Sequence, residues 1–456
     1  MTAYWCALAW LGGERAESGV LVEVEGSAIT SVTPGEDSPP RDATILDGLT
    51  LPGLANAHSH AFQRALRGRT QSGRGSFWTW REQMYALTSR LDPDALYQVS
   101  RMAFLEMALA GITAVGEFHY LHHGAHGTPY DDPNEMGRVL IAAAAEAGVR
   151  ITLIDACYLH GGIGEPPEGA QRRFSDGTAE AWAERVEALT GAAERASGAA
   201  ALDARGSFRL GAAIHSVRAV DPESAATIAS WARDGGRPLH AHVSEQPAEN
   251  EACRDAYGRT PTGVLADAGA LDASFTAIHA THLTDEDVRM RGDARACCCI
   301  CPTTERDLAD GIGGMRRLLD AGASLSLGSD SHAVIDMFEE ARAVELDERL
   351  ASLERGRHGA PGLLLAATAG GHACLGWDDA GRIEAGARAD LVTVALDGVR
   401  VAGTDPATAL ESVVFAGTAA DMRHVLVDGN EIVTDGRHTA IDVPRELDEA
   451  IRAVMA

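Results

Sequence analysis

Eight short apolar runs, many of them separated by alanine-rich helical segments, limit the fold of this chain more than any other feature. Segments 93–110 and 136–149 have the length and composition of such helices. Because repeated strand–helix units build parallel sheets, the eight runs predict an α/β fold, a (β/α)8 barrel. The runs are 49–60, 111–120, 149–160, 208–217, 237–245, 275–282, 294–302 and 323–332.

In seven of these runs, His, Asp, Glu or Tyr stands where the apolar stretch ends. Barrel enzymes carry their catalytic groups at the carboxyl ends of the strands, so this regularity predicts an enzyme with its site at that end. The run 294–302 is the exception, because it ends in Cys-Pro and is followed by Thr303, Thr304 and Glu305.

Charge and cysteine usage narrow the class of protein. The 456 residues carry a formal net charge of −27, which argues against nucleic acid or an anionic membrane as partner, since both need basic patches. The N-terminus does not resemble a signal peptide, and no stretch approaches the roughly 20 apolar residues of a membrane span. Four of the eight cysteines fall within 297–301, too close for a regular disulfide framework, so we expect buried thiols in a reducing cytoplasm.

Histidines and carboxylates gather at the ends of four runs. His58 and His60 are two positions apart, and on a strand such residues point the same way, toward one metal ion or simply as polar residues at a strand terminus. Three imidazoles and one carboxylate suit zinc or ferrous iron, and an open coordination position would lower the pKa of water. A nearby carboxylate would move protons. The other members of the set are His242, Glu245, His279 and Asp330.

The remaining histidines near these runs have simpler interpretations. His240 is expected to point into the barrel one layer below the site, and His282 to be a solvated loop residue. The histidines of the second strand–helix loop are interpreted mainly as loop residues, with an adventitious metal site as the alternative. They are His119, His122, His123 and His126.

The pattern of HxH, HxHxxE, single His and single Asp resembles the amidohydrolase superfamily over nearly the whole chain. "GSAITSVTPG" and "GRIEAGARADLVTVAL" resemble its flanking strand pairs, which implies a small β-sandwich made from residues 1–50 and 381–456 beside a barrel of residues 51–380, with a terminal helix at the end. The resemblance implies four metal ligands, His58, His60, His242 and Asp330, and three catalytic residues, Glu245, His279 and Asp330.

The absence of lysine restricts the metal site. Many superfamily members bridge two metals with a carboxylated lysine, and all 39 basic residues of this chain are arginine. The resemblance therefore implies the mononuclear branch, with one divalent ion per chain. Zn²⁺ is the first expectation and Fe²⁺ the second.

Segments such as "NAHSHAFQRALRG", "SFWTWREQMY" and "CPTTERDLADG" resemble the formimidoylglutamate deiminases of histidine breakdown. The resemblance implies a homodimer that hydrolyses N-formimino-L-glutamate, a dicarboxylate, to N-formyl-L-glutamate and ammonia. Two substrate carboxylates call for bidentate arginines. The residues implied to bind substrate are Gln63, Arg81, Tyr120, His215 and Arg218. The stretch "IGGMRRLL" departs from this family, which more often has bulky apolar residues there.

Two other functions fit parts of the pattern. A related aminohydrolase acting on a purine-like ring or a guanidino compound would use the same metal set, with aromatic stacking in place of paired arginines. A barrel that serves only as a scaffold would have lost metal ligands, whereas this sequence has the full set. Arg218, taken alone, also suits a plain surface or helix-start position.

Overall fold

The computed structural model describes residues 1–195 and 206–455, and each of the eight runs contains one strand of a parallel sheet. The strands neighbour one another in chain order, and a parallel bridge between Ser59 and Asp330 joins the first strand to the end of the last. The (β/α)8 barrel is therefore confirmed. Its strands are β5 (Leu54–Ser59), β6 (Ile112–His119), β7 (Arg150–Cys157), β8 (Phe208–Ile214), β9 (Leu239–Val243), β10 (Phe275–His279), β11 (Cys297–Ile300) and β12 (Ser324–Leu327).

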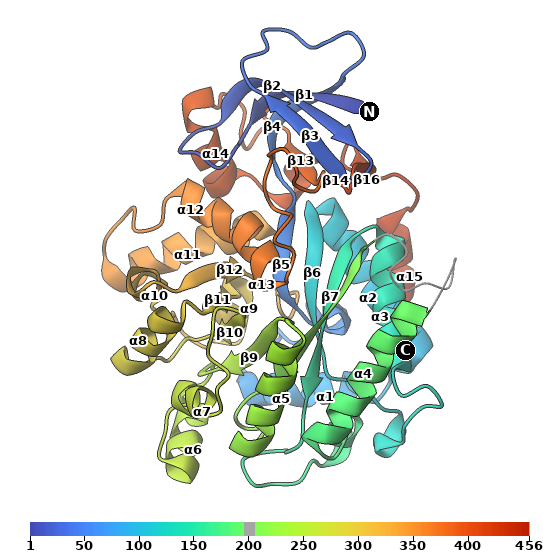
Figure 1. Cartoon of the computed structure of the whole chain (residues 1–456), viewed down its shortest axis with the longest axis vertical. Helices are drawn as coiled ribbons and strands as arrows, with labels where there is room; N and C mark the ends of the chain where they lie inside the picture. The colour runs from blue at the N-terminus through green and yellow to red at the C-terminus, as the bar shows by residue number, and fades with distance from the viewer. Residues whose placement is uncertain (196–205, 456) are drawn as a thin grey trace.

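Helices surround the barrel (Figure 1). The two predicted helical segments correspond to α2 (Pro93–Leu109) and α3 (Glu135–Ala147). Helix α2 begins where Asp92 accepts a hydrogen bond from the Ala95 amide and Pro93 occupies the first turn, both common starts for a helix. The others are α1 (Phe77–Thr88), α4 (Ala179–Arg195), α5 (Pro222–Asp234), α6 (Pro247–Tyr257), α7 (Pro261–Asp267), α8 (Asp285–Ala294), α9 (Pro302–Asp307), α10 (Met315–Ala321), α11 (Met337–Ser352), α12 (Ala360–Leu365), α13 (Gly371–Cys374), α14 (Ala409–Ala416) and α15 (Val443–Met455).

The two ends of the chain build a separate β-structure, as predicted, in the form of one mixed sheet of eight strands. Figure 1 shows this sheet at the top of the molecule, with α1 near the bottom. The boundaries expected near residues 50 and 380 stay predictions. The strands are β1 (Thr2–Ala9), β2 (Glu17–Glu25), β3 (Ala28–Thr33), β4 (Thr44–Pro52), β13 (Leu391–Val394), β14 (Met422–Val427), β15 (Asn430–Thr434) and β16 (Arg437–His438).

The terminal sheet and the barrel are joined by one residue and by a buried ion pair. Gly53 links β4 to β5, and a Cβ atom there would lie 2.3 Å from Thr113 Oγ1, so only glycine fits. Arg150, at the start of β7, donates to Asp390 Oδ1 at 2.9 Å and lies 3.3 Å from Asp428 Oδ1. These contacts fix the end of the barrel opposite the carboxyl ends of its strands.

The cysteines line the interior rather than form disulfides. All eight are free and buried, as predicted, and Cys297, Cys299, Cys301 and Cys374 belong to one apolar cluster.

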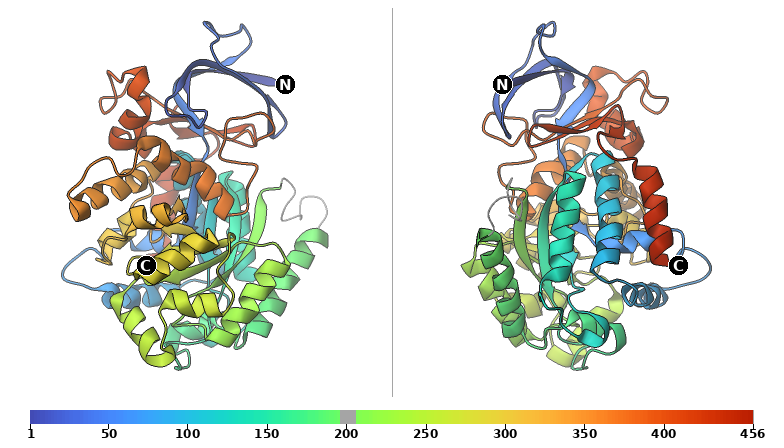
Figure 2. Two further views of the ribbon diagram at one scale, coloured as in Figure 1. Left: turned by 60° about the vertical axis from the view of Figure 1, so that its left-hand side comes forward. Right: turned by 90° about the vertical axis from the view of Figure 1, so that its right-hand side faces the viewer.

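The C-terminal helix α15 packs beside α2, where Arg101 Nη1 lies 2.8 Å from Glu446 Oε2 (Figure 2). Among the described helices, none combines the length and the apolarity needed to cross a membrane.

Candidate active site

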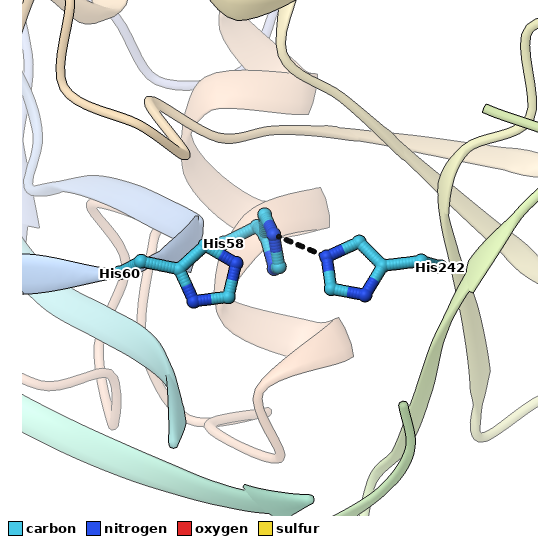
Figure 3. Close-up of side chains that lie close together, drawn as sticks. All are labelled: His58, His60 and His242. Atoms are coloured by element: carbon cyan, nitrogen blue, oxygen red, sulfur yellow. Dashed lines mark hydrogen bonds between the residues drawn. The ribbon is translucent and has the colours of Figure 1, made fainter. Parts of the chain in front are cut away.

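The four predicted metal ligands converge at the carboxyl ends of β5, β9 and β12. Figure 3 shows the imidazoles of His58, His60 and His242 facing one another. His58 Nε2 lies 3.3 Å from both His242 Nε2 and Asp330 Oδ1, and His60 Nε2 lies 3.4 Å from Asp330 Oδ1. All four side chains are buried. The alternation of side chains along β5 therefore brings the HxH pair to one point, as expected.

Backbone carbonyl groups fix the orientation of two of these imidazoles. His60 Nδ1 donates to the carbonyl oxygen of Phe118 and His242 Nδ1 to that of His215, both at 2.9 Å. Since a carbonyl oxygen only accepts, Nδ1 carries the proton and Nε2 presents its lone pair to the shared point.

The charge state of the cluster also suits a cation. Burial lowers the pKa of His58 to about 3 and also lowers the pKa of His60 and His242, so the imidazoles are neutral. Burial alone would raise the pKa of Asp330, but its hydrogen bond to His58 and the nearby imidazoles of His58, His279 and His60 together outweigh this, and its pKa lies below the ordinary value. Neutral imidazoles and an ionised carboxylate at one point are a donor set that fits a divalent metal ion.

His279 and Glu245 lie beside this cluster. His279 Nε2 is 3.7 Å from both Glu245 Oε1 and Asp330 Oδ2. Burial raises the pKa of Glu245, the direction expected for a carboxyl group that accepts and releases protons. Burial would lower the pKa of His279, but Glu245 and neighbouring carboxylates outweigh it and raise the pKa. The predicted proton-handling pair is thus in contact.

A cavity of about 300 Å³ opens onto His60, His242, His279 and Asp330. The structure brings all the residues predicted to bind substrate to its wall. Whether they contact a substrate stays a prediction. They are Gln63, Arg81, Tyr120, His215 and Arg218.

The two arginines of the cavity have different surroundings. The Arg81 guanidinium lies 4.5 Å from the ring centre of Trp78 and 5.6 Å from that of Tyr85. Within residues 1–195 and 206–455, no carboxylate forms an ion pair with it. Arg218 Nη2, in contrast, lies 3.8 Å from Glu245 Oε2, and Arg218 Nε lies 4.0 Å from Glu249 Oε2. Among the described residues, Arg81 is thus a cation without a counter-ion.

Sequence reasoning missed Glu305 and Glu249. Glu305 Oε1 lies 3.3 Å from His279 Nδ1, and buried Glu249 accepts a hydrogen bond from the Glu245 amide. The only signal for Glu305 was its place three residues beyond the end of the seventh apolar run. Glu249 lies on α6, four positions after Glu245, and has no comparable signal.

Of the second-loop histidines, His119 is the last residue of β6, whereas His122 and His123 lie in the loop that follows it, as interpreted. His119, His122 and His123 are buried, and only His126 of the four is exposed. His119, His122 and Asp155 lie close enough to hold a metal, but Arg185 donates to both oxygens of Asp155.

The other two histidines lie as follows. His240 is buried with Nε2 3.0 Å from the Cys374 carbonyl oxygen, consistent with an inward layer residue. His282 is half-buried rather than solvated, because its Nε2 donates to the Asp310 carbonyl oxygen at 2.8 Å.

Comparison with known proteins identifies the family. The model of the amidohydrolase family matches residues 49–432. The chain belongs to the amidohydrolase family. A formimidoylglutamate deiminase from Pseudomonas aeruginosa is 36% identical over 436 residues, which cover 93% of this chain and 91% of the relative.

Two further relatives bear on the activity and on the fold. A 5-methylthioadenosine/S-adenosylhomocysteine deaminase from Natronomonas pharaonis is 30% identical over 407 residues, 89% of this chain and 86% of that protein. The crystal structure of an amidohydrolase from Brucella melitensis superposes with a TM-score of 0.89 at 32% identity, with both chains fully covered. This amidohydrolase is therefore a hydrolase of C–N bonds, and its donor set supports a divalent metal.

Proposed function

We propose that this amidohydrolase hydrolyses N-formimino-L-glutamate to N-formyl-L-glutamate and ammonia. The observation that carries the proposal is the pair of guanidinium groups, Arg81 and Arg218, in the cavity that contains the metal-ligand cluster. A dicarboxylate substrate would supply the counter-charge that Arg81 lacks. The 36% identical relative is named for this substrate.

The reaction replaces the terminal imino group of the substrate by oxygen. Water adds to the formimino carbon, the bond from that carbon to the terminal nitrogen breaks, and ammonia leaves. Both hydrogens of the water end on the leaving nitrogen, so two protons must cross from one side of the carbon to the other. The step needs a nucleophile and a group that moves protons.

We propose that His58, His60, His242 and Asp330 hold one divalent ion, Zn²⁺ by preference and Fe²⁺ as the alternative. The ion would supply Lewis acidity, which makes water a stronger nucleophile at neutral pH. A single ion follows from the absence of lysine, because the common two-metal sites of the family need a carboxylated lysine.

The proton transfers are assigned to Glu245, with His279 and Asp330 beside it. Glu245 lies 3.7 Å from His279, and its raised pKa allows the carboxylate to take a proton from water and return it to nitrogen. His279 and Asp330 face the same point and would form hydrogen bonds with the protonated adduct of water and substrate.

Arg81 and Arg218 are assigned to the two substrate carboxylates. Gln63, Tyr120 and His215 would complete the binding surface, and Gln63 Nε2 already donates to Tyr120 Oη at 3.2 Å. The homodimer and the cytoplasmic location expected from the resemblance stay predictions.

A ring deaminase is the second candidate. Phe77, Trp78, Trp80 and Tyr85 line the cavity, and aromatic rings of this kind stack on purines. The relative at 30% identity is named for 5-methylthioadenosine and S-adenosylhomocysteine.

An ammonia-release assay separates the two candidates. The holoenzyme is offered N-formimino-L-glutamate, purine nucleosides and guanidino compounds at equal concentration. The proposal expects the highest kcat/KM for N-formimino-L-glutamate, with N-formyl-L-glutamate as product. A higher kcat/KM for a purine nucleoside would favour the ring deaminase instead.

A further inference from the structure

Glu305 gives the one barrel strand without a site residue at its end a contact with the active site. Strand β11 runs into Cys301 and α9, and the side chain of Glu305 turns back from the first turns of that helix. It is 7% exposed. Its Oε1 accepts a hydrogen bond from the Cys301 amide at 2.9 Å and lies 3.3 Å from His279 Nδ1.

His279 is contacted on both of its ring nitrogens by carboxylates. Nδ1 faces Glu305, whereas Nε2 lies 3.7 Å from Glu245 Oε1 and from Asp330 Oδ2. A carboxylate at Nδ1 requires a proton on that nitrogen, which leaves Nε2 to exchange hydrogen bonds with the site. This arrangement fixes both the tautomer and the plane of the ring.

The backbone alone does not hold this ring. His279 and Ala280 have φ values of 68° and 51°, in the left-handed region that residues other than glycine rarely adopt. Such a turn sets where the imidazole leaves the backbone but does not by itself determine its side-chain torsions. Glu305 supplies the contact at Nδ1 that restricts them.

We propose that Glu305 is a positioning residue, which acts on the reaction through His279 by fixing its tautomer and aiming Nε2 at Glu245. The proposal rests on the proposed function only in that His279 takes part in proton transfer. A merely structural role, as acceptor for the Cys301 amide at the start of α9, is the competing explanation.

Substitution Glu305→Gln separates the two roles. The amide oxygen of glutamine still accepts from the Cys301 amide, so α9 keeps its hydrogen bond, but the negative charge facing His279 is lost. We expect kcat to fall by about 10- to 100-fold, the usual scale for partners that orient an active-site imidazole, with KM and metal content close to the parent. Asp307→Asn removes a charge from the same helix outside the site and should leave kcat unchanged.

A double-mutant cycle shows whether Glu305 acts through His279. In a His279→Asn background, Glu305→Gln should cause no further loss of kcat, because the imidazole it orients is absent. If the losses multiply instead, or if Glu305→Gln retains the parent kcat, Glu305 is structural and the proposal is overturned.

A spectroscopic measurement keeps the test independent of the substrate. In the zinc-loaded protein with ¹⁵N-labelled histidine, a hydrogen-bonded Nδ1–H of His279 should give a low-field proton signal. The signal should be lost in His279→Asn, shift in Glu305→Gln and stay in place in Asp307→Asn. A signal that Glu305→Gln leaves unmoved would refute the proposal, even if N-formimino-L-glutamate is not the substrate.

Discussion

His60 is held on both sides of its ring, by the Phe118 carbonyl at Nδ1 and by the cluster at Nε2. His60→Ala removes one ligand and leaves a cavity in a buried cluster. We expect the variant to lose its metal and its turnover, and to unfold at a lower temperature because bound metal stabilises the folded state. Elemental analysis and thermal unfolding measure both. His126→Ala, at an exposed histidine, should keep the metal; a His60→Ala protein with one tightly bound metal would contradict the ligand assignment.

Glu245 lies beside the cluster but contacts it through His279 rather than directly. Glu245→Gln should therefore keep the metal, whereas turnover should fall by on the order of 10²-fold or more, the usual scale for a general acid–base group. Steady-state kinetics and metal analysis of the same preparation test this. Glu251→Gln, an exposed position on α6, is the control. Near-normal turnover of Glu245→Gln would exclude the role.

The arginines should determine specificity rather than metal binding. Arg81→Met and Arg218→Met each remove a guanidinium from the cavity wall, and we expect kcat/KM for N-formimino-L-glutamate to fall by roughly two or more orders of magnitude. An uncharged formimino compound should lose much less, and Arg254→Met, exposed on α6, should change neither value. Variants that discriminate between the two compounds as the parent does would show that the arginines are not carboxylate ligands.

Between β6, β7 and α4, a buried polar network connects the three elements. His122 Nε2 donates to the Ala156 carbonyl oxygen at 2.9 Å, and His122 Nδ1 lies 3.3 Å from His119 Nε2. Arg185 of α4 bridges Asp155 of β7 and Asp176. Burial, with the nearby charge of Arg185, lowers the pKa of His122 to about 4.

This network predicts a loss of stability in acid. In the unfolded chain the pKa of His122 is near 6.5, so between pH 6.5 and about 4 the unfolded state binds a proton that the folded state does not. The free energy of unfolding should fall over that interval by about 3 kcal/mol from this residue. In urea unfolding of metal-free protein, His122→Gln should lose correspondingly less stability between pH 7 and pH 4.

The exposed neighbour provides the control for that experiment. His126→Gln should lose as much stability on acidification as the parent does, because this side chain lies at the surface. Equal losses in His122→Gln and the parent would mean that His122 is not held neutral by burial.

Among the secondary-structure elements, the strands could be predicted from the sequence. The strands of a barrel are covered on both faces, so their sequences are nearly continuous apolar runs. All eight residues of β7 are buried, for example. The network behind them could not, since Arg185 lies 30 positions from Asp155, on a helix whose pairing no local spacing reveals. The same distinction holds for the site. The HxH pair could be predicted because its spacing of two matches the alternation of a strand. The contact between Glu305 and His279 could not, because it depends on the path of α9.

In the whole molecule, the chemistry lies at one end of the barrel and the terminal sheet at the other. Arg150 and Asp390 join the sheet to the strand ends far from the metal ligands, and removing one partner of such a buried pair leaves an uncompensated charge. The carboxyl ends of the strands then present the cluster, the proton-handling pair and the cavity. We therefore assign the proposed function to one metal and one cavity per chain.

Titration of metal-stripped protein with zinc, while ammonia release from N-formimino-L-glutamate is followed, tests this assignment most directly. We predict that activity rises in proportion to added zinc and reaches a plateau at one equivalent per chain. A plateau at two equivalents, or no ammonia at any zinc concentration from protein that binds the metal, would contradict the account.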